Sequence, residues 1–109
     1  NIKKDRSVFI KKALIVLIGN FNLNQSVIDK LMKIPLDSNI KASDIGDFSL
    51  ATKLSFEKDY FNSLKILFRI VGQKDLMQLN LIQIYTVLTI LKNLGLDEQL
   101  KKISERILL

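Results

Sequence analysis

The sequence predicts an all-α fold, a compact array of five to six helices built from helix–turn–helix pairs. Such pairs form either a helical-repeat-like array or an orthogonal bundle. Apolar residues recur at three- and four-residue spacing along most of the 109-residue chain, as they do in amphipathic helices. One proline and four glycines leave little to interrupt a helix. No segment alternates apolar and polar residues in the way that predicts a strand.

Length and composition indicate a single all-helical domain over residues 1–109. Hydrophobic residues make up 48% of the chain and charged residues 26%, a balance typical of globular proteins. The chain begins with Asn1 in place of Met. We therefore expect a processed product or a segment of a longer helical protein.

The first helix is predicted from about Asp5 to Ile18, where Gly19-Asn20 ends it. One of its faces is apolar, and four further residues widen the apolar surface almost all the way round: Ile10, Leu14, Ile15 and Ile18. A helix of this kind requires neighbours on more than one side.

A short second helix is predicted to begin after the cap Asn24 and to end near Ile34, because Pro35 disfavours helix in the residue before it. Residues 35–46 show the weakest periodicity and are expected to form an exposed loop. Ile40 and Ile45 are expected to hold that loop against the core.

Two helices are predicted between Asp47 and Gly72. Asp47 is expected to cap a short helix that ends before Ser55, and a longer helix is expected from Phe56 to Val71. Four of the six phenylalanines lie between positions 48 and 68. The densest part of the core is therefore expected here, and for this core we name Phe56, Phe61, Leu64 and Phe68.

The last thirty residues predict two amphipathic helices that fold back on each other. Asn80 is expected to cap the fifth helix, and Gly95 to end it in a left-handed backbone conformation, with Leu96 completing a Schellman motif. The acidic pair Asp97-Glu98 suits the positive end of a sixth helix, which runs to about Ile107.

The segment from Leu94 through Ile107 resembles the turn and second helix of a tetratricopeptide-type repeat, with Gly95 in the turn. It is also similar to the C-terminal end of uncharacterised bacterial helical proteins. Leu100 and Ile107 stand where the tetratricopeptide family has small residues, and Leu88 is bulky for its position. The resemblance implies a helix–turn–helix topology and no activity.

The residue types present in the chain argue against many kinds of catalytic and metal-binding site. The chain has no cysteine, histidine or tryptophan, so the common ligand sets for zinc, copper, haem and iron–sulfur clusters are missing. No phosphate-binding loop, dinucleotide fingerprint or calcium loop is present. Glu57 and Asp59 lie two apart on a predicted helix and are interpreted as surface charge. We expect no enzymatic activity, no catalytic residues, no metal and no cofactor.

The formal charge of +6 leaves two alternative functions open. A small basic helical domain that binds nucleic acid is one, although the lysines are scattered and we expect such binding to be weak. A helical bundle that acts at a membrane surface, like bacteriocin-immunity proteins, is the other. The longest apolar run, Ala13 to Ile18, is too short to cross a bilayer. The sequence indicates no compartment.

The leading hypothesis is a non-enzymatic α-helical module for protein–protein interaction or scaffolding, a subunit of a larger assembly. Its partner would be another protein or the flanking helices of a longer chain. The candidate interface lies on the first helix and consists of Ile10, Leu14, Ile15 and Ile18, since that helix is apolar on most of its circumference.

Overall fold

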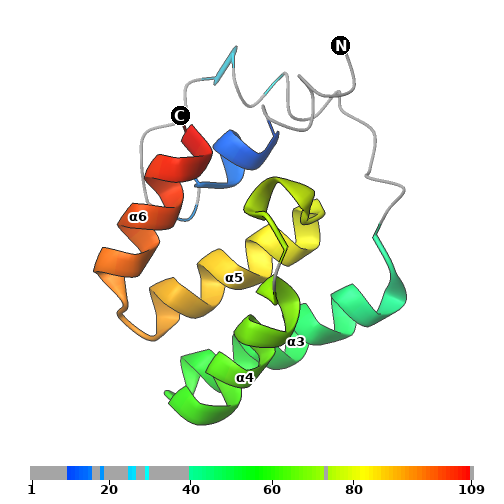
Figure 1. Cartoon of the computed structure of the whole chain (residues 1–109), viewed down its shortest axis with the longest axis vertical. Coiled ribbons are helices and arrows are strands. Elements are labelled where there is room, and N and C mark those ends of the chain that lie inside the picture. The colour runs from blue at the N-terminus through cyan, green and yellow to red at the C-terminus, as the bar shows by residue number, and fades with distance from the viewer. Residues whose placement is uncertain are drawn as a thin grey trace.

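The computed structural model describes residues 10–15, 18, 25, 26, 29, 40–72 and 74–108. Every regular element in these ranges is helical, and none of these residues lies in a strand, so the all-α prediction is confirmed (Figure 1). The elements are α3 (Ala42–Phe56), α4 (Tyr60–Val71), the 3₁₀ helix η1 (Leu76–Gln78), α5 (Leu81–Asn93) and α6 (Asp97–Leu108). Residues 10–15 are also helical.

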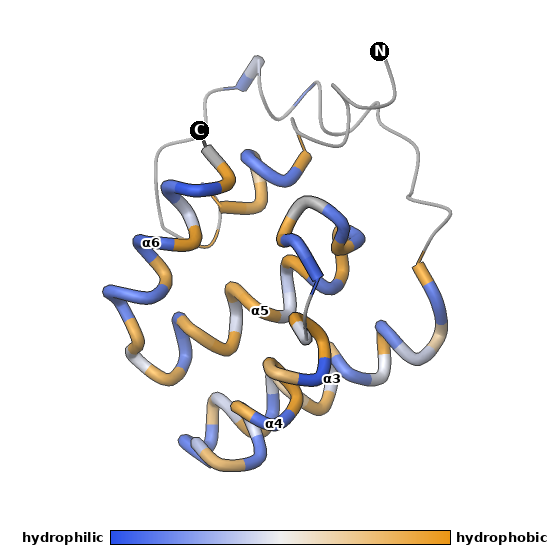
Figure 2. Tube along the Cα trace, viewed as in Figure 1, coloured by the Kyte–Doolittle hydropathy of each residue, from blue (hydrophilic) through white to orange (hydrophobic). Residues whose placement is uncertain are grey.

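Helix α5 is the centre of the described part of the fold. It packs against α3, α4 and α6, and Figure 1 shows it between α6 and the α3–α4 pair. Ile84, Val87, Leu88 and Ile90 are at most 1% exposed. In Figure 2 hydrophobic residues predominate along α5, whereas hydrophilic and hydrophobic residues alternate along α6. A helix buried on several sides needs an apolar surface nearly all round.

Both ends of α5 match the predicted caps. Asn80 Oδ1 accepts a hydrogen bond from the backbone N–H of Gln83 at 2.9 Å, and Gln83 Oε1 accepts one from the backbone N–H of Asn80 at 3.0 Å. At the other end Gly95 has φ +75°, and the backbone N–H of Leu96 donates to the carbonyl of Leu91 at 2.9 Å. The left-handed glycine and the Schellman motif are therefore confirmed.

Helix α3 begins earlier than the sequence predicts. Residues 42–46 belong to it, so the expected exposed loop over 35–46 is wrong for this part, and residues 35–39 lie outside the described residues. The backbone N–H of Lys41 donates to Asp44 Oδ2 at 3.0 Å, which caps the helix upstream of Asp47. Asp47 does not cap a helix. It lies within α3 and pairs with Arg69.

The boundary between α3 and α4 is also shifted. Phe56 is the last residue of α3, and α4 begins at Tyr60 and ends, as predicted, at Gly72. Asp59 caps α4 by accepting a hydrogen bond from the backbone N–H of Asn62 at 3.2 Å. The predicted single helix from Phe56 to Val71 is therefore wrong at its start.

The core is aliphatic and is not centred on the phenylalanines. It gathers side chains from α4, α5 and α6 together with Ile15 and Ile18. Phe56, Phe61 and Phe68 are 77%, 72% and 65% exposed, so the prediction that they form the core is wrong. Of the four residues named for that core, the described structure packs only Leu64 against it.

Small side chains explain why α3 contributes no bulky residue at its closest approach. Ala51 and Ser55 are fully buried on the face that α3 turns toward the rest of the fold. Two small residues one turn apart let helix backbones approach closely, which leaves less room for bulky neighbours. Ile45, expected to hold a loop to the core, is 55% exposed on α3, whereas Ile40 is half-buried.

The two N-terminal predictions fall mostly outside the described residues. Of the first helix, predicted over residues 5–18, residues 10–15 and 18 are described, and all are helical. Of the second, predicted up to about Ile34, only Gln25, Ser26 and Asp29 are described, and these are helical too.

A candidate interaction surface on α3 and α4

A groove between α3 and α4 is the clearest candidate site in the described part of the chain. Its volume is about 520 Å³. We call it the α3–α4 groove. It is lined by Leu50, Leu54, Asn62, Lys65, Ile66, Phe68 and Arg69. Leu50 and Phe68 are both exposed at its rim. Large apolar side chains gathered at one place on a surface are typical of binding sites.

Helix α4 positions the aromatic part of this surface. Phe61 and Phe68 are seven residues apart and therefore share one face of the helix. The opposite face carries the buried residues Ser63, Ile66 and Ile70. The two phenylalanines thus point outward because the inner face of α4 is already filled by other side chains.

The charged residues that line the groove are both basic. Lys65 lies between the two phenylalanines along α4, and its Nζ is 5.5 Å from the centre of the Phe61 ring. Arg69 Nη2 forms an ion pair with Asp47 Oδ1 of α3 at 2.5 Å. The positive charge of Lys65 therefore stands over an aromatic face, while that of Arg69 joins the two walls of the groove.

The turn between α3 and α4 is fixed to the end of α5. Lys58, whose φ is +65°, donates from its ammonium group to the carbonyl of Asn93. The Tyr60 hydroxyl donates to the carbonyl of Leu94 at 3.3 Å. The Asn93 Nδ2 group donates to Ser55 Oγ at 3.1 Å. Because the last carbonyls of a helix have no partner within it, these contacts both satisfy them and hold α4 in place.

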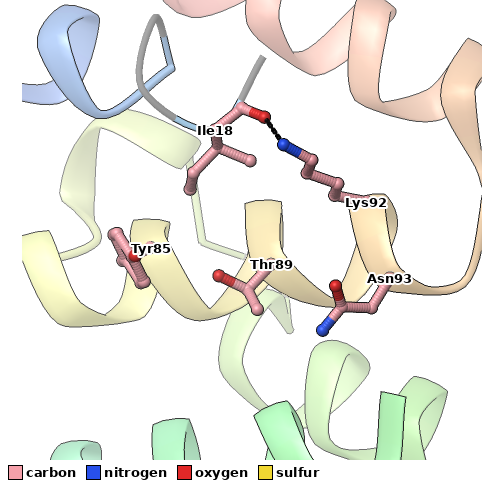
Figure 3. Close-up of a pocket in the computed structure, with 5 residues that line it drawn as sticks. All are labelled: Ile18, Tyr85, Thr89, Lys92 and Asn93. Carbon is pink, nitrogen blue, oxygen red and sulfur yellow. Dashed lines mark hydrogen bonds between the residues drawn. The ribbon is translucent and has the colours of Figure 1, made fainter. Parts of the chain in front are cut away.

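A second, smaller hollow lies beside α5. Its volume is about 330 Å³, and it is lined by Ile18, Tyr85, Thr89, Lys92 and Asn93 (Figure 3). The ammonium group of Lys92 donates to the carbonyl of Ile18. Figure 3 shows the lysine side chain directed at that carbonyl, so Lys92 connects α5 to Ile18.

Three acidic residues in the described ranges have structural roles: Asp44 and Asp59 cap helices, and Asp47 pairs with Arg69. No group of three or more His, Cys, Asp or Glu residues there is placed to hold a metal ion. Hydrogen bonds from the Asn62 side chain and then from its backbone N–H hold the pKa of Asp59 below its usual value, with desolvation opposing them. Asp59 is therefore the cap of α4. No helix in the described part is both long and apolar enough to cross a membrane.

The residues predicted for an interface on the first helix are separated from this groove. Ile15 and Ile18 are 1% and 7% exposed and belong to the chain's own core, whereas Ile10 and Leu14 are half-buried. None of the four lines the α3–α4 groove. An interface through Ile10 and Leu14 stays a prediction.

Sequence reasoning missed the α3–α4 groove, although a signal for it exists. Helix α4 carries aliphatic residues on one face, and its two phenylalanines stand on the other face among polar residues, where an apolar side chain is not needed for the core. Phe61 and Phe68 were assigned to the core because aromatic residues at helical spacing usually pack there.

Comparison with known proteins adds no relative. No protein-family model matches the chain, and neither a curated protein nor a solved structure matches it significantly. The resemblance of the C-terminal helix pair to tetratricopeptide-type repeats stays a prediction.

Proposed function

We propose that this chain is a non-enzymatic helical interaction module that binds another protein through the α3–α4 groove. The observation that carries the proposal is the exposed aromatic face of α4, where Phe68 lines the groove and Phe61 lies two turns away on the same face. Fully burying one such side chain stabilises by about 1.5–3 kcal/mol. Aromatic side chains exposed in the free protein are also enriched among the residues that contribute most to interfaces.

The helices that form the groove are held in place by contacts with α5, which supports the same function. The α3–α4 turn is hydrogen-bonded to the carbonyls of Asn93 and Leu94, so the groove is built on helices that are already packed. A preformed surface loses less conformational freedom on binding than a loop does.

Nucleic-acid binding is the second candidate, and one observation favours it. Lys65 stands over the ring of Phe61, and exposed aromatics beside cations are typical of proteins that bind single strands. However, the other groove cation, Arg69, is engaged by Asp47, and Leu50, Leu54 and Ile66 are aliphatic and offer no ring for a base to stack on.

Site-specific photo-crosslinking in the cells that produce the protein would test the proposal. A photoreactive amino acid replaces Phe61 in one variant and Lys101, an exposed residue of α6, in the control. We expect one defined protein adduct from position 61 and none from position 101. The adduct protein, once purified, should bind the wild-type chain and should bind Phe68→Gln at least tenfold more weakly.

Two results would contradict the proposal. Equal adducts from positions 61 and 101 would mean that the α4 face beside the groove is not the contact surface. A nucleic-acid adduct from position 61, with no protein adduct, would favour the second candidate.

A further inference from the structure

We propose that the α3–α4 groove binds an amphipathic helix whose polar flank is acidic, presented by an acidic partner protein. This inference rests on the proposed function and specifies the chemistry of the partner. It is drawn from the shape of the groove, the spacing of its apolar residues and the sign of its charges.

The shape and spacing fit a helix. Two packed helices form the walls of the groove, and Leu50 and Leu54 are four residues apart on α3. On α4 the lining residues recur at three- and four-residue spacing over about 10 Å of helix axis; they include Asn62, Lys65, Ile66 and Arg69. Helix-in-groove recognition uses anchors at this spacing on the bound helix, which meet matching ridges on the receptor.

The charges indicate an acidic partner. Lys65 and Arg69 are four residues apart and therefore lie on neighbouring turns along one edge of the groove. A carboxylate on a bound helix would meet Lys65, whereas Arg69 already pairs with Asp47 of α3. The chain as a whole carries a formal charge of +6, which adds a long-range attraction for an acidic protein.

The same charges disfavour a second copy of this chain. A twofold interface through the groove would place Lys65 and Arg69 near the same residues of the other copy. Like charges brought together in this way weaken association, and both copies carry the same net positive charge.

Three synthetic peptides of about 18 residues, five helical turns, would test the proposal against the full chain. Each carries leucines at three- and four-residue spacing, and the peptides differ only in the flanking residues, which are glutamate, glutamine or lysine. Binding is followed by fluorescence anisotropy. We expect the glutamate peptide to bind about threefold more tightly than the glutamine peptide, as one surface ion pair with Lys65 would give, and the lysine peptide to bind most weakly.

Variants of the chain would locate the binding and its charge. Phe68→Gln should weaken the glutamate peptide at least tenfold. Lys65→Glu should reduce the preference for the glutamate peptide and strengthen binding of the lysine peptide. Lys101→Glu, the same change of charge on exposed α6, should alter binding only slightly, and in opposite directions for the glutamate and lysine peptides. Circular dichroism of each variant checks that the helices are retained.

Several outcomes would overturn the inference. Equal binding of the glutamate and glutamine peptides would contradict the proposal that the bound helix has an acidic flank. If no peptide binds but single-stranded DNA or phosphatidylserine vesicles do, and Lys65→Glu loses that binding, the occupant of the groove is a nucleic acid or a membrane surface and not a helix. A dimer in sedimentation that Phe68→Gln abolishes would mean a second copy. Failure of all peptides, with a protein adduct still formed at position 61, would reject this inference and leave the proposed function standing. If no peptide binds and no protein adduct forms at position 61, both this inference and the proposed function are rejected.

Discussion

The contrast between Leu88 and Phe68 gives the sharpest test of this fold. Leu88 is fully buried at the middle of α5, the helix that packs against α3, α4 and α6, whereas Phe68 is 65% exposed on α4. Leu88→Ala should lower the free energy of unfolding by about 3–5 kcal/mol, since it removes apolar contacts and leaves a cavity in a site packed on several sides.

Phe68→Ala removes a larger side chain and should nevertheless change stability little. Most of the ring already contacts water, so its truncation leaves no enclosed cavity. Alanine also favours helix more than phenylalanine does, which offsets part of the lost contact with the groove. We expect a change within about 0.5 kcal/mol, as for most surface substitutions.

Urea and thermal unfolding followed by far-ultraviolet circular dichroism would measure both effects. For a domain of this size, the loss at Leu88 corresponds to a melting midpoint lower by roughly 12–20 °C, while Phe68→Ala should melt within a few degrees of the wild type. Lys101→Ala on exposed α6 is the matched surface control. A cost above about 2 kcal/mol for Phe68→Ala, or below about 1 kcal/mol for Leu88→Ala, would refute this assignment of core and surface.

Three further predictions concern helix ends and a glycine. Gly46→Ala should raise the free energy of unfolding by about 0.5–1 kcal/mol, because the residue is exposed within α3 and an added Cβ meets nothing within 4 Å, whereas Gly95→Ala should lower it by about 1 kcal/mol, because φ is +75° there. Asn80→Ala should cost about 1–2 kcal/mol in urea unfolding through loss of the α5 cap. Because hydrogen bonds from Asn62 lower the pKa of Asp59, its stabilisation is present above the unfolded pKa and is lost as pH falls through the folded pKa. Asp59→Asn should therefore reduce the pH dependence of stability in acid, measured by urea unfolding at a series of acidic pH values.

Helix caps were predictable because their chemistry is local. Asn80 precedes an apolar run and is followed three residues later by Gln83, and the structure forms the reciprocal cap between them. Gly95 follows the last residues of α5, and its lack of a Cβ permits the left-handed conformation that the chain needs to turn back. Neither feature depends on what the rest of the chain does.

The start of α3 and the location of the core depend on tertiary packing and were mispredicted. Residues 42–46 have weak apolar periodicity because none of them is buried, and the residues of α3 that are buried, Ala51 and Ser55, are small. Ile45 and Phe56, which a search for bulky apolar residues does register, lie on exposed parts of the helix. The apolar pattern of a sequence therefore predicts which face is buried only where bulky side chains make the buried contacts.

The candidate groove could not be found from the sequence for a related reason. Leu50 and Leu54 of α3 meet Phe68 of α4 only because the turn at Lys58 folds the two helices together. The contacts that fix this turn join Lys58 and Tyr60 to the end of α5, more than thirty positions along the chain. Sequence spacing within either helix does not contain that geometry.

Stability of the described fold does not explain the phenylalanines on the outer face of α4. The inner face is filled by Ile66, Leu67 and Ile70, and the reasoning for Phe68→Ala indicates that an outward residue there could be polar with little loss. A surface free of other requirements is usually polar at such positions, since exposed apolar clusters promote unwanted association. An aromatic pair seven residues apart, with Lys65 between its members, is therefore better accounted for by a contact that the free chain does not make. That reasoning favours binding through α3 and α4 over an interface confined to Ile10 and Leu14.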